Sequence, residues 1–158
     1  MDEILNNSID DLNGRYLTFY IAEAIYGLEL KHVIEIIKME PITPVPNVAY
    51  YIKGIINLRG KIVPVIDVRT KFSLEEVPYD DKTCIIVVVI NDMQVGLIVD
   101  QVSEVVSAEQ AVLTTPPTAG GNNASKYLSS IATFGNRVVL NIDCERFFMS
   151  DLGSGALY

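Results

Sequence analysis

The side chains best suited to chemistry in this sequence are two aspartates that each end an apolar stretch. Asp67 ends KIVPVID and Asp143 ends VVLNID, and a pair of carboxylates could act as general acid and base. An aspartate at such a position also caps the first turn of a helix, which requires no partner. Because the pattern occurs twice, we favour the cap. A small enzyme built on the carboxylate pair remains the alternative.

No other residues have a spacing typical of catalysis or metal binding. His32 is the only histidine, and Cys84 and Cys144 lie far apart in the sequence, each in an apolar segment. A zinc ion needs about four ligands, which these three residues cannot supply. The cysteines resemble reduced core thiols, and the sequence has neither a glycine-rich phosphate loop nor a nucleophile elbow. We therefore expect no metal, no cofactor and no enzymatic activity.

The chain repeats its own pattern, and this repeat sets the elements that position the residues above. YLTFYIAEAIYGLEL matches IIVVVINDMQVGLIV farther along the chain. This match defines a first repeat interval, which aligns Gly27 with Gly96 and Glu35 with Glu104. KIVPVIDVRTKF matches RVVLNIDCERFF at a second, longer interval. Alternation of apolar and polar residues predicts short strands in both copies. The loop of residues 113–126 accounts for the extra length of the second copy, and we expect it to be exposed.

Two lobes of similar size follow from this repeat. One copy of about 70 residues buries too little surface to be very stable alone, so we expect two lobes packed together. Short, evenly spaced strands favour small barrels, which predicts an all-β fold of two pseudo-repeated five-stranded β-barrels with short helices. The expected boundaries are a flexible acidic tail at 1–14, a first lobe at 15–82, a second lobe at 83–150 and a C-terminal tail at 151–158.

Charge and hydropathy exclude several classes of partner. The 158 residues include 20 acidic and 12 basic side chains, a net charge of −8, with no basic cluster that could follow a phosphate backbone. Nucleic acid is therefore not an expected partner, and a barrel for single-stranded nucleic acid is disfavoured. The longest apolar run, Cys84–Ile90, is far shorter than the roughly 20 residues of a membrane helix. We expect a cytoplasmic protein that does not insert into a membrane.

One difference between the copies is an arginine in a turn. The stretch NLRG places Arg59 where the second copy has Gly135-Asn136, a natural two-residue hairpin connection. The turn itself therefore does not require an arginine. The planar guanidinium of Arg59 suits recognition of a carboxylate, and a solvated surface arginine is the alternative.

A second difference concerns the first strand of each copy. The face opposite the core has Tyr16, Thr18 and Tyr20 in the first copy, whereas strand Cys84–Ile90 of the second copy is apolar on both faces. Apolar surface of this kind is normally covered. Either the other lobe or another protein covers it.

The stretches YLTFYIAEAIYGLELKHVIEII, TPVPNVAYYIKGIINLRGKIVPVIDVRTKF and VGLIVDQVSEVV resemble the CheW family of bacterial chemotaxis. The resemblance spans residues 16–148 and implies two SH3-like barrels in a non-catalytic adaptor. Such adaptors link the cytoplasmic tips of chemoreceptors, which are long helical hairpins, to the regulatory domain of the histidine kinase CheA. The resemblance therefore implies recruitment to membrane-associated receptor arrays. Alternatives of the same class are a coupling domain for another chemosensory pathway, such as twitching motility, or a CheV-like protein.

The resemblance also implies two sets of binding residues. The receptor tip is expected in a groove between the lobes, near a salt bridge between Glu35 and Arg59. The positions that match contact with methyl-accepting chemoreceptors are Val33, Glu35, Gly54, Asn57, Arg59, Val102 and Val105. The positions that match the kinase-binding region are Cys84, Ile85 and Val87.

Overall fold

The computed structural model of the chain describes residues 14–116 and 125–148. The expected tails lie outside the described residues except for Gly14, and so does most of the expected loop at 113–126. The strands are β1 (Arg15–Ile21), β2 (Ala24–Glu29), β3 (Val33–Lys38), β4 (Ile52–Leu58), β5 (Lys61–Asp67), β6 (Cys84–Ile90), β7 (Met93–Val99), β8 (Gln101–Ser107), β9 (Val112–Thr114), β10 (Leu128–Phe134) and β11 (Arg137–Ile142). The short helices are η1 (Leu30–His32), α3 (Val68–Lys71), η2 (Ala108–Gln110), η3 (Ser125–Tyr127) and an α-helical segment over 144–148.

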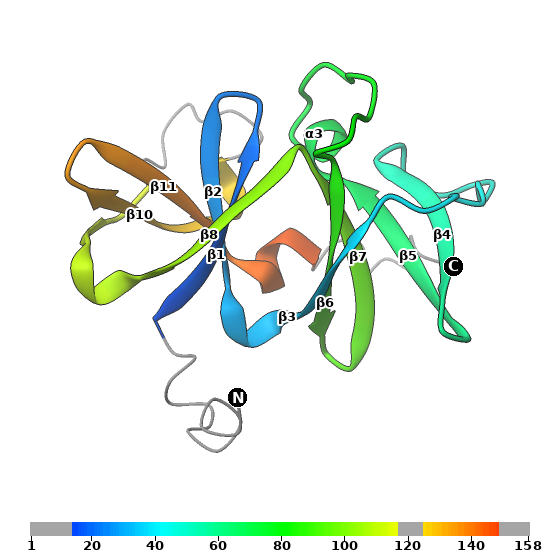
Figure 1. Cartoon of the computed structure of the whole chain (residues 1–158), viewed down its shortest axis with the longest axis horizontal. Coiled ribbons are helices and arrows are strands. Elements are labelled where there is room, and N and C mark those ends of the chain that lie inside the picture. Colours follow the sequence, from blue (N-terminus) through cyan, green and yellow to red (C-terminus); the bar gives the residue numbers. More distant parts are fainter. Residues whose placement is uncertain (1–13, 117–124, 149–158) are drawn as a thin grey trace.

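Two curved sheets form the molecule (Figure 1). One sheet has six strands in the order β8-β1-β2-β11-β10-β9, and the other has five in the order β3-β6-β7-β5-β4. The expected all-β fold with short helices is confirmed. The sixth strand, β9, is the difference from the expected five-stranded sheets, and it pairs with β10 over three residues.

The elements follow the two repeats in the sequence, but the sheets do not follow the expected lobes at 15–82 and 83–150. The six-stranded sheet joins β1 and β2 of the first repeat to β8, β10 and β11 of the second. The five-stranded sheet joins β6 and β7 of the second repeat to β3, β4 and β5 of the first. The parallel pairs β2–β11 and β5–β7 complete this exchange. The lobe boundary was wrong because the chain changes sheets after each first hairpin, through η1 and through Asp100.

An ion pair fixes the crossing at Asp100. The Asp100 carboxylate accepts hydrogen bonds from Arg69 Nε at 2.9 Å and Arg69 Nη2 at 2.7 Å, and from the backbone N–H of Ala22 at 2.7 Å. A guanidinium fork on a carboxylate is one of the stronger polar contacts in proteins. It joins α3, the β1–β2 turn and the start of β8, which sets the direction in which β8 leaves the crossing.

Two apolar clusters explain why β6 is apolar on both faces. Ile86, Val88 and Ile90 point into a core shared by both sheets, while Ile85 and Val87 point into the interior of the five-stranded sheet. The shared core also holds buried aromatic and aliphatic side chains of the six-stranded sheet. The chain therefore covers the second face of β6 itself, without another protein.

Candidate partner-binding surface

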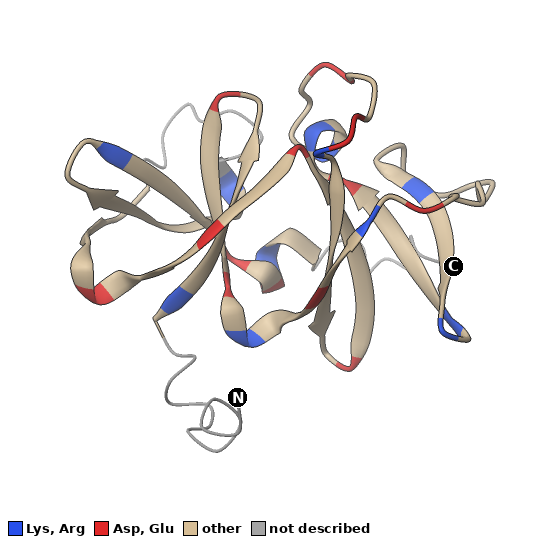
Figure 2. Cartoon of the chain, in the orientation of Figure 1, with Lys and Arg blue, Asp and Glu red and all other residues tan. Residues whose placement is uncertain are grey.

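Glu35 and Arg59 form an ion pair across the open edge of the five-stranded sheet. A β-bulge between Val33 and Glu35 shifts the register of β3 against β6, and Arg59 occupies the β4–β5 turn with a φ of 52°. Arg59 Nη2 donates to Glu35 Oε1, as the resemblance implied. The Arg59 side chain remains 69% exposed, and Figure 2 shows the basic tip of this hairpin. The pair is thus accessible from solvent.

Gly54 and Asn57 both have structural roles in β4, the strand that leads to Arg59. The backbone of Gly54 has a φ of 147°, and a Cβ atom there would lie 2.1 Å from the carbonyl oxygen of Thr43. Only glycine fits this position. The Asn57 Oδ1 accepts the N–H of Gly60 at 2.9 Å and closes the turn, while the Asn57 residue itself is exposed. Gly54 is buried, so its structural effect on a binding surface is indirect.

The six-stranded sheet has an ion pair at the equivalent place, which the comparison of turn residues missed. Glu104 is the repeat equivalent of Glu35 and lies within a β-bulge, here in the pairing of β1 with β8. Glu104 Oε1 accepts from Arg137 Nη1 at 2.8 Å. Arg137 stands two residues after Gly135, so it escapes a position-by-position alignment with Arg59. The signal available in the sequence was the second glutamate at the first repeat interval.

The apolar residues expected to meet the receptor lie on β3 and β8. Val33 and Val102 are repeat equivalents, and both are partly buried against the shared core. Val105 is 47% exposed, and its repeat equivalent Ile36 is 45% exposed. Sequence reasoning omitted Ile36, although the first repeat interval points to it. Each sheet therefore presents an exposed aliphatic side chain next to its glutamate, and β3 presents a second one, Ile34, at 43%.

The residues expected to bind the kinase differ sharply in exposure. Ile85 and Val87 are 0% exposed, in the interior of the five-stranded sheet. Assigning them to a docking surface was wrong, because a fully buried side chain cannot contact a partner. Cys84 is partly exposed at the start of β6, and burial raises the pKa of its thiol.

The two aspartates are separate helix caps. Asp67 Oδ1 accepts the N–H of Thr70 at 3.3 Å, and Asp143 Oδ1 accepts the N–H of Arg146 at 3.1 Å. The second oxygen of Asp67 accepts the hydroxyl of Tyr79 at 2.8 Å. Burial, followed by this hydrogen bond, raises the pKa of Tyr79. Each carboxylate serves its own turn, so the pair does not form an acid/base site.

Two kinds of feature are absent from residues 14–116 and 125–148. Within these ranges no cluster of three or more His, Cys, Asp or Glu side chains could hold a metal ion. No helix in the same ranges is long and apolar enough to cross a membrane.

The described residues thus form two interlocked sheets with exposed ion pairs at their edges, and their two capping aspartates do not form an acid/base site. The family model described as CheW-like domain matches residues 15–151. The chain therefore belongs to the CheW-like family.

Individual relatives agree with this assignment. The chain is 35% identical over 142 residues to the chemotaxis protein CheW of Klebsiella aerogenes, covering 90% of this chain and 86% of that protein. It is 32% identical over 131 residues to CheW of Bacillus subtilis, covering 83% and 84%. The crystal structure of the scaffolding protein TtCheW from Thermoanaerobacter tengcongensis superposes with a TM-score of 0.77 at 33% identity, covering 85% of this chain and 92% of that one. The protein is a chemotaxis adaptor with SH3-like barrels, not an enzyme.

Proposed function

We propose that this chain couples the cytoplasmic tips of methyl-accepting chemoreceptors to the histidine kinase CheA in membrane-associated arrays. Its family membership and its likeness to a chemotaxis scaffolding protein support this function. In this mechanism no bond is made or broken. Receptor state changes kinase activity through the geometry of contacts that the adaptor holds together.

The observation that carries this proposal is the exposed Glu35–Arg59 pair. A non-glycine residue with positive φ costs roughly 1–2 kcal/mol of stability. An exposed ion pair returns roughly 0–1 kcal/mol. Arg59, 69% exposed with a φ of 52°, is therefore not explained by the stability of the fold. A partner that uses its guanidinium explains why an arginine occupies this turn.

The surface proposed for the receptor tip comprises the β4–β5 turn with the exposed parts of β3 and β8. Interfaces commonly combine an apolar centre with a polar rim. The Glu35–Arg59 pair forms that rim, and Asn57 closes the turn that carries Arg59. Gly54 lies further back in β4, where it allows the close approach of Thr43. We add Ile36 to the expected apolar contacts because its exposure matches that of Val105. The complete apolar set is Val33, Ile36, Val102 and Val105.

The surface proposed for the kinase regulatory domain is the exposed start of β6 around Cys84. This residue packs against the shared core and remains partly exposed. Ile85 and Val87 act behind this surface as interior packing. Cys84→Arg is expected to weaken sedimentation with CheA while receptor fragments still bind.

The test of the receptor site is Arg59→Gly in a reconstitution with CheA and receptor signalling fragments. Glycine accepts the positive φ without strain, so the melting temperature should stay level or rise slightly. Receptor-dependent kinase activity should fall severalfold. Lys61→Ala, at the start of β5 beyond the same turn, is the matched control and should retain activity. Full receptor-dependent kinase activity with Arg59→Gly, or unfolding of this variant, would show that Arg59 does not bind the receptor and has at most a structural role.

A further inference from the structure

The two sheets differ at the open edge beneath each ion pair. In the five-stranded sheet, the chain fills this space with its own side chains. Leu58 is buried in the interior cluster, and Ile37 and Met39 pack against that cluster. The interior next to the Glu35–Arg59 pair is therefore closed to a partner.

In the six-stranded sheet the corresponding side chains leave a cavity. By the first repeat interval, Val106 is the equivalent of Ile37, and the small Ala108 is the equivalent of Met39. At the second interval, Phe134 stands for Leu58 and is partly exposed where Leu58 is buried. The aliphatic side chains of β9 do not fill this space either, because Val112 is 67% exposed and Leu113 is 52% exposed.

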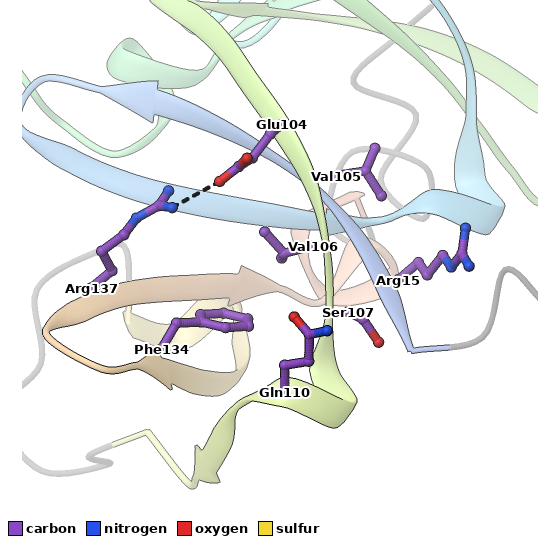
Figure 3. Close-up of a pocket in the computed structure, with 8 residues that line it drawn as sticks. All are labelled: Arg15, Glu104, Val105, Val106, Ser107, Gln110, Phe134 and Arg137. Atoms are coloured by element: carbon purple, nitrogen blue, oxygen red, sulfur yellow. Dashed lines mark hydrogen bonds and ion pairs between the residues drawn. The ribbon is translucent and has the colours of Figure 1, made fainter.

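The cavity has a volume of about 480 Å³ and opens between β8, η2 and the β10–β11 hairpin (Figure 3). Its apolar lining includes Val106 and Phe134, and Gln110 stands at its rim. A volume of this size accommodates more than one side chain. The space is thus large enough for a short segment of another chain.

The charges at the rim favour a carboxylate. Arg15 and Arg137 line the cavity together with a single acid, Glu104, in a protein whose net charge is −8. Arg137 gives one N–H to Glu104 and retains further donors, because a guanidinium has five. Arg15 is exposed and makes no ion pair within the part of the chain that the structure describes.

We propose that this cavity is a docking pocket for a protein segment in which an apolar side chain stands next to a carboxylate. The apolar side chain fills the space that Leu58, Ile37 and Met39 occupy in the other sheet. The carboxylate pairs with the remaining N–H donors of Arg137 at the rim. Val105 of β8 lines this pocket and also belongs to the surface proposed for the receptor tip. The inference nevertheless rests on the cavity and its rim charges, and its test uses neither receptor nor kinase, so it can fail independently of the proposed function.

The test is a titration of the full-length, ¹⁵N-labelled chain with capped dipeptides, without kinase or receptor. N-acetyl-Leu-Asp-amide should shift the backbone amides of Val106, Ser107 and Gln110 and saturate in the millimolar range. N-acetyl-Leu-Asn-amide, which lacks the charge, should bind about threefold more weakly, as expected for an exposed ion pair. N-acetyl-Gly-Asp-amide, which lacks the apolar group, should also bind more weakly.

Two variants and a matched control make the result specific. Val106→Phe fills the cavity and should abolish saturable binding, and Arg137→Gln should remove the preference for Asp over Asn. Lys61→Gln, at the repeat equivalent of Arg137, should change neither. The exposed position of Arg137 ensures that at least one variant folds. Equal affinity for all three dipeptides, shifts away from the cavity, or no shifts would overturn the proposal.

Discussion

The interiors of the two sheets are built from equivalent positions but differ in polarity. Ile85 and Val87 lie inside the five-stranded sheet, and their repeat equivalents in the six-stranded sheet are Tyr16 and Thr18. Asn141, the repeat equivalent of a buried valine, is 1% exposed. Its Nδ2 donates to a serine hydroxyl on β10 at 3.1 Å, while its Oδ1 has no hydrogen-bond partner among the described residues. One interior is closed and apolar, and the other is polar.

Thr18 shows what the polar interior does for the surface. Its Oγ1 donates to the carbonyl of Glu104 at 2.6 Å and accepts the N–H of Glu104 at 3.0 Å. The bulge that presents Glu104 is therefore held by a side chain, whereas Val87 at the equivalent place cannot do this. The same bulge is maintained by polar contacts in one sheet and by apolar packing in the other.

The largest expected effect comes from Gly54→Ala. The new Cβ would lie 2.1 Å from the Thr43 carbonyl oxygen, on a backbone with a φ of 147°. We expect a loss of roughly 4 kcal/mol in unfolding free energy, near the upper end for single substitutions. Ser130→Ala, at the repeat equivalent, removes one hydrogen bond and should lose roughly 1 kcal/mol. Urea denaturation measures the unfolding free energy of both variants. Equal losses would contradict the expected difference between the two equivalent positions.

Exchanging the interior residues is expected to have the next largest effect. Val65→Asn, at the repeat equivalent of Asn141, buries an amide in the apolar interior and should destabilise the protein by roughly 3 kcal/mol. Asn141→Val removes a buried oxygen that lacks a partner among the described residues and should change stability by no more than about 1 kcal/mol. Similar losses from both exchanges, measured by denaturation, would contradict the assigned difference in polarity.

Alkaline pH distinguishes Cys144 from Val68, its repeat equivalent. Burial, followed by the charges of Glu29 and Asp143, raises the pKa of the Cys144 thiol to about 12 from 9.0. The folded protein therefore holds this proton more tightly than the unfolded chain. The resulting stability is complete below pH 9 and is lost as the pH rises from 9 toward 12. The wild type should lose about 2 kcal/mol more than Cys144→Val by pH 10.5. Parallel stability curves would refute this.

The smallest effects are expected at the two ion pairs. Arg59→Ala and Arg137→Ala should each leave the urea midpoint close to that of the wild type, because exposed ion pairs contribute little to stability. Denaturation in low and high salt measures this contribution, which should shrink further as salt screens it. A large loss of stability in either variant would give that pair a structural role.

Much of the fold could be predicted because the repeat intervals and strand alternation are local signals. They located the hairpins and the two capping aspartates. Strand exchange between the sheets was not predictable in this way, because pairing within or between repeats buries the same equivalent residues. The full burial of Ile85 and Val87 follows from that exchange. It depends on which strands close the interior around β6.

The candidate site was predicted more unevenly. The Glu35–Arg59 pair came from the family resemblance together with an arginine that its turn does not need. Arg137 was missed because it reaches its glutamate from β11 instead of from the turn. Ile36 could have been found by applying the first repeat interval to Val105.

The most direct test of the central claim is to reverse the charges of the Glu35–Arg59 pair in reconstituted receptor–CheA assemblies. Glu35→Arg, Arg59→Glu and the double exchange should all stay within about 1 kcal/mol of wild-type stability. Both single variants should lose receptor-dependent kinase activity. The double exchange should not restore it, since the partner meets opposite charges at both positions. Wild-type kinase control in either single variant would contradict a binding role for this pair.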